Sequence, residues 1–171
     1  MKATSFQLVM DHLNQHHVRF LLVGGMAVVA HGYGRMTYDI DLVIQLDPLN
    51  IRRTFDALTP LSFLPRIPVT PEEFSDPAIR QKWAREKGMI VLNLYSNAHE
   101  SCAIDLFISE PFPFDEIYEK AIQTTIGGVP FRYVDLDTLI QMKRKAGRPV
   151  DLEDIRHLEL LAADNENKLA D

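Results

Sequence analysis

The chain has 171 residues, with 18 lysines and arginines against 24 aspartates and glutamates, and its formal net charge is -6. This length suits one domain with its own core, and the apolar share of 46% is that of an ordinary globular protein. The negative charge argues against a protein whose main role is to coat nucleic acid, although it leaves nucleic acid open as a substrate.

Membrane and secretory signals are absent from the sequence. The longest apolar stretch, 20–30, is interrupted by Gly24 and Gly25, so it is too short to span a membrane. The first residues lack the apolar segment of a signal peptide. The single cysteine, Cys102, excludes an internal disulfide and is expected to be a small buried residue. These features predict a cytoplasmic protein.

The first half of the chain alternates between helical and strand patterns. Apolar spacing predicts the strands and helices, while Asp47-Pro48 has the N-cap and first-turn proline of a helix. In chain order we expect a helix over 5–16, a strand over 18–23, a helix over 26–32, a strand over 38–45 and a helix over 48–58.

The second half begins with a proline-rich stretch over 60–77, in which Thr70 and Glu73 have the spacing of a capping box. Asp135 and Gly147 are expected to bound a helix, and Asp151 to open the last one. In chain order we expect a helix from Asp76 to Gly88, a hairpin of strands 89–95 and 102–108 around a polar turn at 96–100, a helix over 114–122, two short strands around Gly127 and Gly128, helices over 136–146 and 151–161, and a polar tail from 164.

A glycine pair, Gly24-Gly25, lies between the first strand and the helix that follows it. Backbone N–H groups at such a turn are unpaired and lie at the positive end of the helix dipole, which suits a phosphate. Alone, a glycine pair is more often a simple bend.

Asp39 and Asp41 are separated by one residue in a predicted strand, so their side chains share one face. Two carboxylates this close repel each other unless a divalent cation lies between them. A third acid, Asp105, interrupts the apolar strand 102–108, where a charge requires a partner. Metal ligation is one partner and an arginine such as Arg35 is the alternative.

Together these residues resemble the polymerase-beta-like nucleotidyltransferases, whose signature is a glycine turn, an Asp-x-Asp pair and a third carboxylate on a later strand. The fuller string is still more similar to the AbiEii-type toxin branch and its uncharacterised relatives. It comprises Gly24-Gly25-Met26-Ala27, His31-Gly32, Arg35-Met36-Thr37, Asp39-Ile40-Asp41-Leu42 and, near the C-terminus, Lys143, Ala146, Arg148, Asp151 and Asp154.

The resemblance implies a single nucleotidyltransferase domain over 1–171. Its fold is a mixed α/β (α+β) twisted sheet with flanking helices, with a core over 18–133, a C-terminal helical segment over 135–162 and a polar tail over 164–171. The implied reaction is metal-dependent transfer of a nucleoside monophosphate from a nucleoside triphosphate such as ATP to a hydroxyl. The implied residues are Asp39, Asp41 and Asp105 as ligands of Mg²⁺ or Mn²⁺ and catalytic groups, Lys143 as a further catalytic group, and Gly24, Gly25, Arg35, Thr37 and Arg148 as nucleotide ligands.

Several alternatives stay open at this point. Lys143 is either a phosphate ligand or a lysine on a solvated helix face, and Asp151 is either an N-cap or a partner of Arg148. The AbiEii resemblance implies the toxin of a toxin-antitoxin pair that acts on RNA or protein. The other hypotheses are a small antitoxin nucleotidyltransferase that modifies its cognate toxin, and a non-catalytic scaffold that binds nucleotide or a protein partner.

Overall fold

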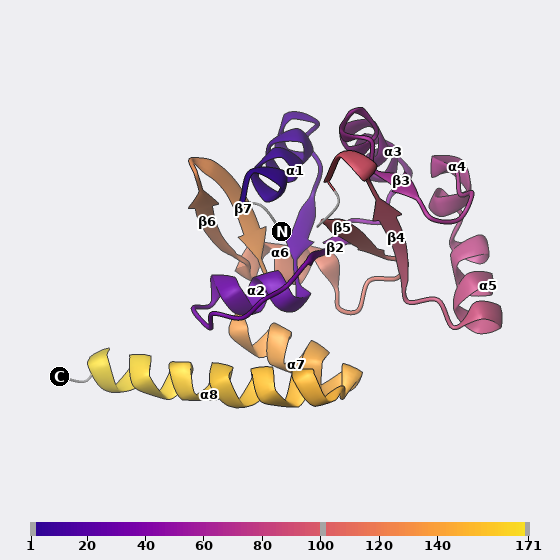
Figure 1. The fold of residues 1–171 in the computed structure, drawn as a ribbon. Coiled ribbons are helices and arrows are strands. Elements are labelled where there is room, and N and C mark those ends of the chain that lie inside the picture. Colours follow the sequence, from indigo (N-terminus) through magenta and orange to yellow (C-terminus); the bar gives the residue numbers. More distant parts are fainter. Residues whose placement is uncertain (1–2, 100–101, 170–171) are drawn as a thin grey trace.

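The computed structural model describes residues 3–99 and 102–169, so Glu100 of the predicted polar turn and the last two residues of the predicted tail lie outside it. Within these ranges the chain forms a mixed sheet surrounded by helices (Figure 1), as predicted. The strand order is β3-β4-β5-β2-β1-β7-β6. The strands are β1 (Phe20–Leu22), β2 (Asp39–Ile44), β3 (Leu64–Pro65), β4 (Val91–Tyr95), β5 (Ala103–Phe107), β6 (Ile122–Ile126) and β7 (Val129–Tyr133).

Helix boundaries follow the capping residues that the sequence offers. Asp47 caps its helix through the N–H groups of Leu49 and Asn50, Thr70 and Glu73 form a capping box, and Asp135 accepts from Thr138. The helices are α1 (Ala3–Gln15), α2 (Gly24–Ala30), α3 (Pro48–Leu58), α4 (Pro71–Ser75), α5 (Pro77–Lys87), α6 (Phe114–Lys120), α7 (Leu136–Ala146) and α8 (Pro149–Leu169), with single 3-10 turns at Thr59–Leu61 and Asn97–His99.

Much of the core lies between one face of the sheet and helices α1 and α3 (Figure 1). Strand residues alternate between the two faces, so Ile40 and Leu42 point into this core together with Ile104 and Leu106. Helix α1 covers part of this core: its Phe6 packs edge to face on Phe131 of β7, with 5.2 Å between the ring centroids. Because the apolar side chains take this face, the acidic residues between them are placed on the opposite one.

Two segments differ from the sequence prediction. A short strand, β3, lies in the proline-rich stretch and pairs antiparallel with β4, where a proline is tolerated because the strand is at the edge of the sheet. Helix α8 starts at Pro149 and continues to Leu169, beyond the predicted end at Leu161. No glycine or proline interrupts the chain after Leu161, so the helix has no local stop signal there.

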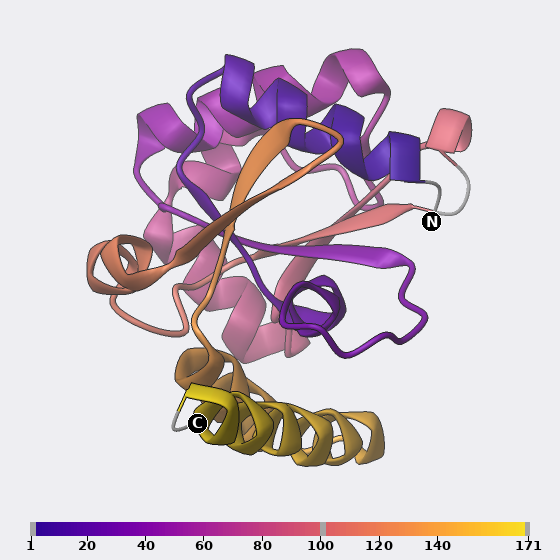
Figure 2. The same ribbon diagram turned by 90° about the vertical axis from the view of Figure 1, so that its left-hand side faces the viewer.

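Helices α7 and α8 pack against each other at the end of the sheet where α2 lies, away from α1 (Figures 1 and 2). The loop after α2 reaches this helix pair, since Tyr33 stacks on His157 of α8 with 4.0 Å between ring centroids. None of the helices in the described part of the chain is long and apolar enough to cross a membrane.

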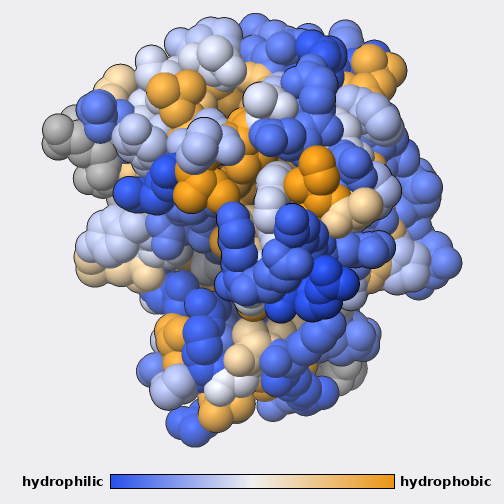
Figure 3. Space-filling model, turned by 90° about the vertical axis from the view of Figure 1, so that its right-hand side faces the viewer, coloured by the Kyte–Doolittle hydropathy of each residue, from blue (hydrophilic) through white to orange (hydrophobic). Residues whose placement is uncertain are grey.

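The face that carries α5 is mainly hydrophilic, with its apolar side chains in small separate patches (Figure 3). Helix α5 contributes to it the exposed residues Gln81, Lys82, Arg85, Glu86 and Lys87. Polar surroundings and a two-residue edge strand both discourage pairing of this sheet edge with another chain.

Candidate active site

The paired strands β2 and β5 bring two of the predicted acids together. These strands run parallel, and their register sets Asp41 directly opposite Asp105 and Asp39 opposite Ala103. Neighbouring strands are about 4.8 Å apart, so the Asp41 and Asp105 side chains lie next to each other on the face away from the core. Asp39 lies on the same face, two residues before Asp41, and is exposed. The roles of the three acids stay a prediction.

The glycine turn lies directly against Asp41. Gly24 has a left-handed φ of +63°, and a Cβ atom on it would overlap the Asp41 Oδ2 atom. Gly25 donates its backbone N–H to the Asp41 carboxylate. A Cβ on Gly25 would lie 2.5 Å from Arg35 Nη2 and 2.6 Å from Thr37 Oγ1. The turn therefore requires glycine at both positions. It also places Arg35 and Thr37 beside Asp41 and Asp105, which we call the acidic pair.

Burial and like charge act together on the acidic pair. Burial, and then the negative charges of Asp105 and Asp39, raise the pKa of Asp41 to about 6, against the opposing effects of the Gly25 N–H and Lys143. Burial and the charge of Asp39 likewise raise the pKa of Asp105, while a hydrogen bond from Asn93 and the positive charge of Arg66 oppose the shift. A bound cation would relieve this repulsion.

The donor set fits a hard divalent ion such as Mg²⁺ or Mn²⁺, which prefers carboxylate oxygens. Asp41 and Asp105 supply such oxygens on adjacent strands, and Asp39 adds a third on the same face. Among residues 3–99 and 102–169, no three acidic, histidine or cysteine side chains are grouped closely enough to hold an ion as they stand. Metal ligation by these residues therefore stays a prediction.

The alternative prediction that Arg35 pairs with Asp105 is wrong. Arg35 contacts Asp154 instead, with Nη1 at 3.2 and 3.4 Å from its two carboxylate oxygens. Asp105 accepts a hydrogen bond of 2.6 Å from the side-chain amide of Asn93, which lies opposite it on β4. Asn93 was not predicted from the sequence, although an amide between Leu92 and Leu94 in an apolar strand was a usable signal.

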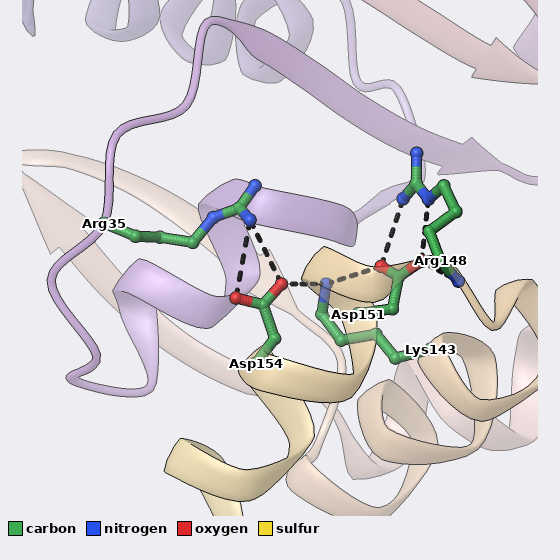
Figure 4. Close-up of polar contacts among 5 residues, drawn as sticks. All are labelled: Arg35, Lys143, Arg148, Asp151 and Asp154. Atoms are coloured by element: carbon green, nitrogen blue, oxygen red, sulfur yellow. Dashed lines mark hydrogen bonds and ion pairs between the residues drawn. The ribbon is translucent and has the colours of Figure 1, made fainter.

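Lys143 is buried, so the alternative of a solvated surface lysine is wrong. Its side chain is 5% exposed, and its Nζ lies 2.7 Å from Asp154 Oδ2 and 3.4 Å from Asp151 Oδ1 (Figure 4). It is a lysine of α7 held between two carboxylates of α8. The apolar face of α7 turns it inward, since Leu139 and Ile140 are buried one turn earlier.

Asp151 pairs with Arg148 and is not an N-cap. Arg148 Nε and Nη2 lie 2.7 and 3.1 Å from the two Asp151 oxygens, and the Arg148 backbone N–H also donates to Asp151. Burial acts to raise the pKa of Asp151, but the hydrogen bond from Arg148 and the charge of Lys143 hold it below its usual value. The Arg148 side chain itself remains 69% exposed.

We call Arg35, Lys143, Arg148, Asp151 and Asp154 the charge network (Figure 4). Its three cationic side chains share two carboxylates, so it carries a net positive charge. Lys143 and Arg148 both interact electrostatically with Asp41, which places the network beside the acidic pair. Arg35 Nε is buried and has no hydrogen-bond partner among the described residues. The arrangement offers cations next to carboxylates, as binding of a metal-bound polyphosphate requires.

No family model matches the sequence, and no curated protein matches it either. Solved structures do match: the lincosamide antibiotic adenylyltransferase LnuA in its lincomycin-bound form superposes with a TM-score of 0.64, covering 94% of this chain and 98% of that one. The chain has the nucleotidyltransferase fold.

Two further structures with this fold are similar over most of the chain. The antibiotic-resistance factor ANT(2'')-Ia has a TM-score of 0.58 and covers 98% of this chain and 92% of its own. An antigenic nucleotidyltransferase-like protein from Paracoccidioides brasiliensis has a TM-score of 0.52, with coverages of 91% and 74%. The sequence identities to LnuA, ANT(2'')-Ia and the fungal protein are 13%, 14% and 15%, so the likeness concerns the fold.

Proposed function

We propose that the protein is a nucleotidyltransferase that moves a nucleoside monophosphate from a nucleoside triphosphate to an acceptor hydroxyl and releases pyrophosphate. The observation that carries the proposal is the Asp41-Asp105 pair, which lies against the Gly24-Gly25 turn on the face of the sheet away from α1 and α3. The fold supports it, and phosphoryl-type transfer suits such a site because its catalysis depends on positioning and charge neutralisation.

Asp39, Asp41 and Asp105 are the proposed ligands of Mg²⁺ or Mn²⁺. When bound, the divalent ions neutralise the polyphosphate and lower the pKa of the attacking hydroxyl. The repulsion between Asp41 and Asp105 gives these carboxylates a reason to bind cations. Asp105 is also the proposed acceptor of the hydroxyl proton, since its burial makes it more basic than an exposed carboxylate.

The triphosphate is proposed to lie between the glycine turn and the charge network. Gly24 and Gly25 let the backbone approach the phosphates, with Arg35 and Thr37 beside them. Arg148 is exposed and acts electrostatically on Asp41, so its guanidinium can reach a ligand bound there. Lys143 is more enclosed, and we propose that it provides positive potential and anchors Asp151 and Asp154.

The first candidate acceptor and the proposed biological role come from the AbiEii resemblance. On that basis the acceptor is RNA or protein, and the chain is the toxin of a toxin-antitoxin pair acting in the cytoplasm. In the antitoxin alternative, the same active site would modify one protein, the cognate toxin. A non-catalytic scaffold would keep nucleotide binding without transfer.

A small-molecule hydroxyl is the second candidate acceptor. It is favoured by LnuA, a lincosamide adenylyltransferase that this chain matches over nearly the full length of both. ANT(2'')-Ia, solved in complex with adenylyl-2''-tobramycin, matches over 98% of both chains. Both proteins are named for antibiotics, so this candidate predicts a small organic acceptor with accessible hydroxyls.

The test is incubation of the protein with Mg²⁺ and each ribonucleoside triphosphate labelled at the α-phosphate, together with total RNA and cell lysate. We expect one fraction, RNA, protein or small molecules, to take up label, and the fraction identifies the acceptor class. Asp41→Asn should abolish uptake, and Asp56→Asn, which changes an exposed acid on α3, should not. Bound nucleotide without label transfer in any fraction would favour the scaffold.

Lys143→Ala should also lower transfer by orders of magnitude, since cationic groups near transferring phosphates are worth several kcal/mol. Because Lys143 is buried, this variant is compared with the parent at a temperature where circular dichroism shows both to be folded. Transfer at the parental rate by the folded variant would contradict the assignment.

A further inference from the structure

A row of polar side chains crosses the face of the sheet away from α1 and α3, next to the Asp41-Asp105 pair. Asp41 of β2 lies opposite Asp105 of β5, and Asp105 lies opposite Asn93 of β4. Arg66, which directly follows β3, continues the row because its backbone N–H donates to the Asn93 carbonyl at 3.0 Å. The row therefore runs from the edge of the sheet to the predicted catalytic carboxylates.

Side-chain hydrogen bonds connect three members of the row. Asn93 Nδ2 donates to Asp105 Oδ1 at 2.6 Å, and Arg66 Nε donates to Asn93 Oδ1. The Arg66 guanidinium also lies over the ring of Tyr95, 5.2 Å from its centroid, which holds the arginine in place. Arg66, the donor of one of these hydrogen bonds, is charged, and so is Asp105, the acceptor of the other. Both hydrogen bonds are therefore charge-assisted.

The arginine determines which way the Asn93 amide points. An asparagine amide has a donor end and an acceptor end, and only the acceptor end can receive the Arg66 N–H. With Oδ1 on Arg66, the Nδ2 group must face Asp105; the reverse orientation would set the amide oxygen against a carboxylate. One Asp105 oxygen is thus engaged by Asn93, and the other is left for a ligand or an acceptor hydroxyl.

We propose that Asn93 and Arg66 are positioning residues that hold the Asp105 carboxylate in the orientation from which it meets the acceptor hydroxyl, with Arg66 acting through Asn93. The inference rests on the proposed function, to which it adds two residues. Positioning of this kind matters because a displacement of about 1 Å at a reacting group can reduce a rate about 100-fold.

Stability does not explain this pair. Leu92 and Leu94, the neighbours of Asn93 in β4, point into the core beneath α1 and α3. Asn93 lies half-buried on the opposite face of the sheet. Arg66 is exposed, and an exposed arginine contributes little to the free energy of unfolding. Asn93 donates to Asp105, and Arg66 donates to Asn93 and reaches Asp105 only through that amide or through its charge.

The first measurement is structural and needs no activity. In a ¹⁵N-¹H NMR spectrum, the side-chain amide of Asn93, assigned as the signal lost in Asn93→Ala, should show one proton shifted downfield by its short hydrogen bond. The shift should collapse in Arg66→Ala and in Asp105→Ala. It should persist in Arg85→Ala, which removes an exposed arginine from α5. An unshifted amide in the parent would overturn the inference.

The second measurement uses label transfer from the α-labelled nucleoside triphosphate into the lysate fraction that the parent labels best. Asn93→Ala and Arg66→Ala should each lower kcat about 10- to 100-fold and leave KM for the nucleotide within about twofold. Asn97→Ala, at an exposed asparagine beyond the end of β4, is the matched control and should behave as the parent.

A double-mutant cycle then separates positioning from direct contact. If Arg66 acts through Asn93, the double variant should be no slower than Asn93→Ala alone. Additive losses would show that Arg66 acts independently of Asn93, through its charge on Asp105 or on the substrate, and would overturn the inference. Active parent with unchanged single variants would overturn it and leave the proposed function intact, while a parent without any transfer would overturn both. Arg66 is exposed, so Arg66→Ala is expected to keep the fold, and circular dichroism of each variant checks this before its rate is compared.

Discussion

The acidic pair and the charge network lie side by side but handle their charges in opposite ways. In the acidic pair, like charges are held on adjacent strands, and the pKa of Asp41 rises to about 6. In the network, each buried carboxylate has cations at hydrogen-bond distance, and the pKa of Asp151 falls. The first region therefore keeps an unrelieved repulsion, which we propose a cation relieves, and the second is satisfied within the protein itself.

This difference separates two kinds of contribution. We expect the acidic pair to reduce the stability of the protein without metal and to gain stability if an ion binds there. The network links α7 and α8 to each other and to the Arg35 loop, so its pairs hold the C-terminal helices next to the glycine turn. Substitutions should consequently stabilise the protein in one region and destabilise it in the other.

The largest effect is expected for Lys143→Ala. Removing this buried cation leaves Asp151 and Asp154 facing each other with only their arginine partners, which should cost about 3 to 5 kcal/mol in the free energy of unfolding. Urea denaturation measures it, and Lys145→Ala, an exposed lysine of the same helix, is the control. A loss as small as that of the control would mean that the network does not hold the helices together.

Metal binding should have the next largest effect. At a concentration about 100 times its dissociation constant, Mg²⁺ or Mn²⁺ should stabilise the protein by about 2.7 kcal/mol, because only the folded state unites the carboxylates. Calorimetry and thermal unfolding with and without EDTA measure affinity and stabilisation. The double variant Asp39→Asn with Asp41→Asn should lose both. Unchanged binding in that variant would rule out the site.

Gly24→Ala tests the contact between the glycine turn and the acidic pair. The methyl group would overlap Asp41 Oδ2 at a backbone φ of +63°, so we expect a loss of about 2 kcal/mol from strain and displacement of the carboxylate. Gly88→Ala shares the positive φ but meets no atom within 4 Å, so it measures the backbone strain alone. Both losses are measured by urea denaturation. Equal losses in the free energy of unfolding would mean that the contact with Asp41 does not contribute to the effect of Gly24→Ala.

The smallest expected effect has the opposite sign. Asp41→Asn removes a charge from the acidic pair and can still accept the Gly25 N–H, so in EDTA at neutral pH it should stabilise the protein by about 1 kcal/mol. Its thermal midpoint is compared with those of the parent and of Asp56→Asn. Destabilisation of Asp41→Asn in EDTA would mean that the two carboxylates are not strained in the metal-free protein.

Much of the fold could be read from the sequence because its signals are local. Asp47 with Pro48, Thr70 with Glu73, and Asp135 with Gly147 specify helix ends through hydrogen bonds to nearby backbone groups. The one-residue spacing of Asp39 and Asp41 places both on one strand face whatever the neighbouring strands are. Candidate residues for a metal site and a glycine turn were therefore available from the sequence.

Only the tertiary structure decided what these residues face. The pairing of β2 with β5, far apart in the chain, sets Asp105 opposite Asp41, and the pairing of β4 with β5 sets Asn93 on the other side. The sequence left Lys143 open between a phosphate ligand and a surface lysine, because charged residues follow it in its helix. Its burial depends on where α8 packs. Local propensity acts over a few residues, whereas strand order and helix packing are determined by how the whole chain buries its apolar surface.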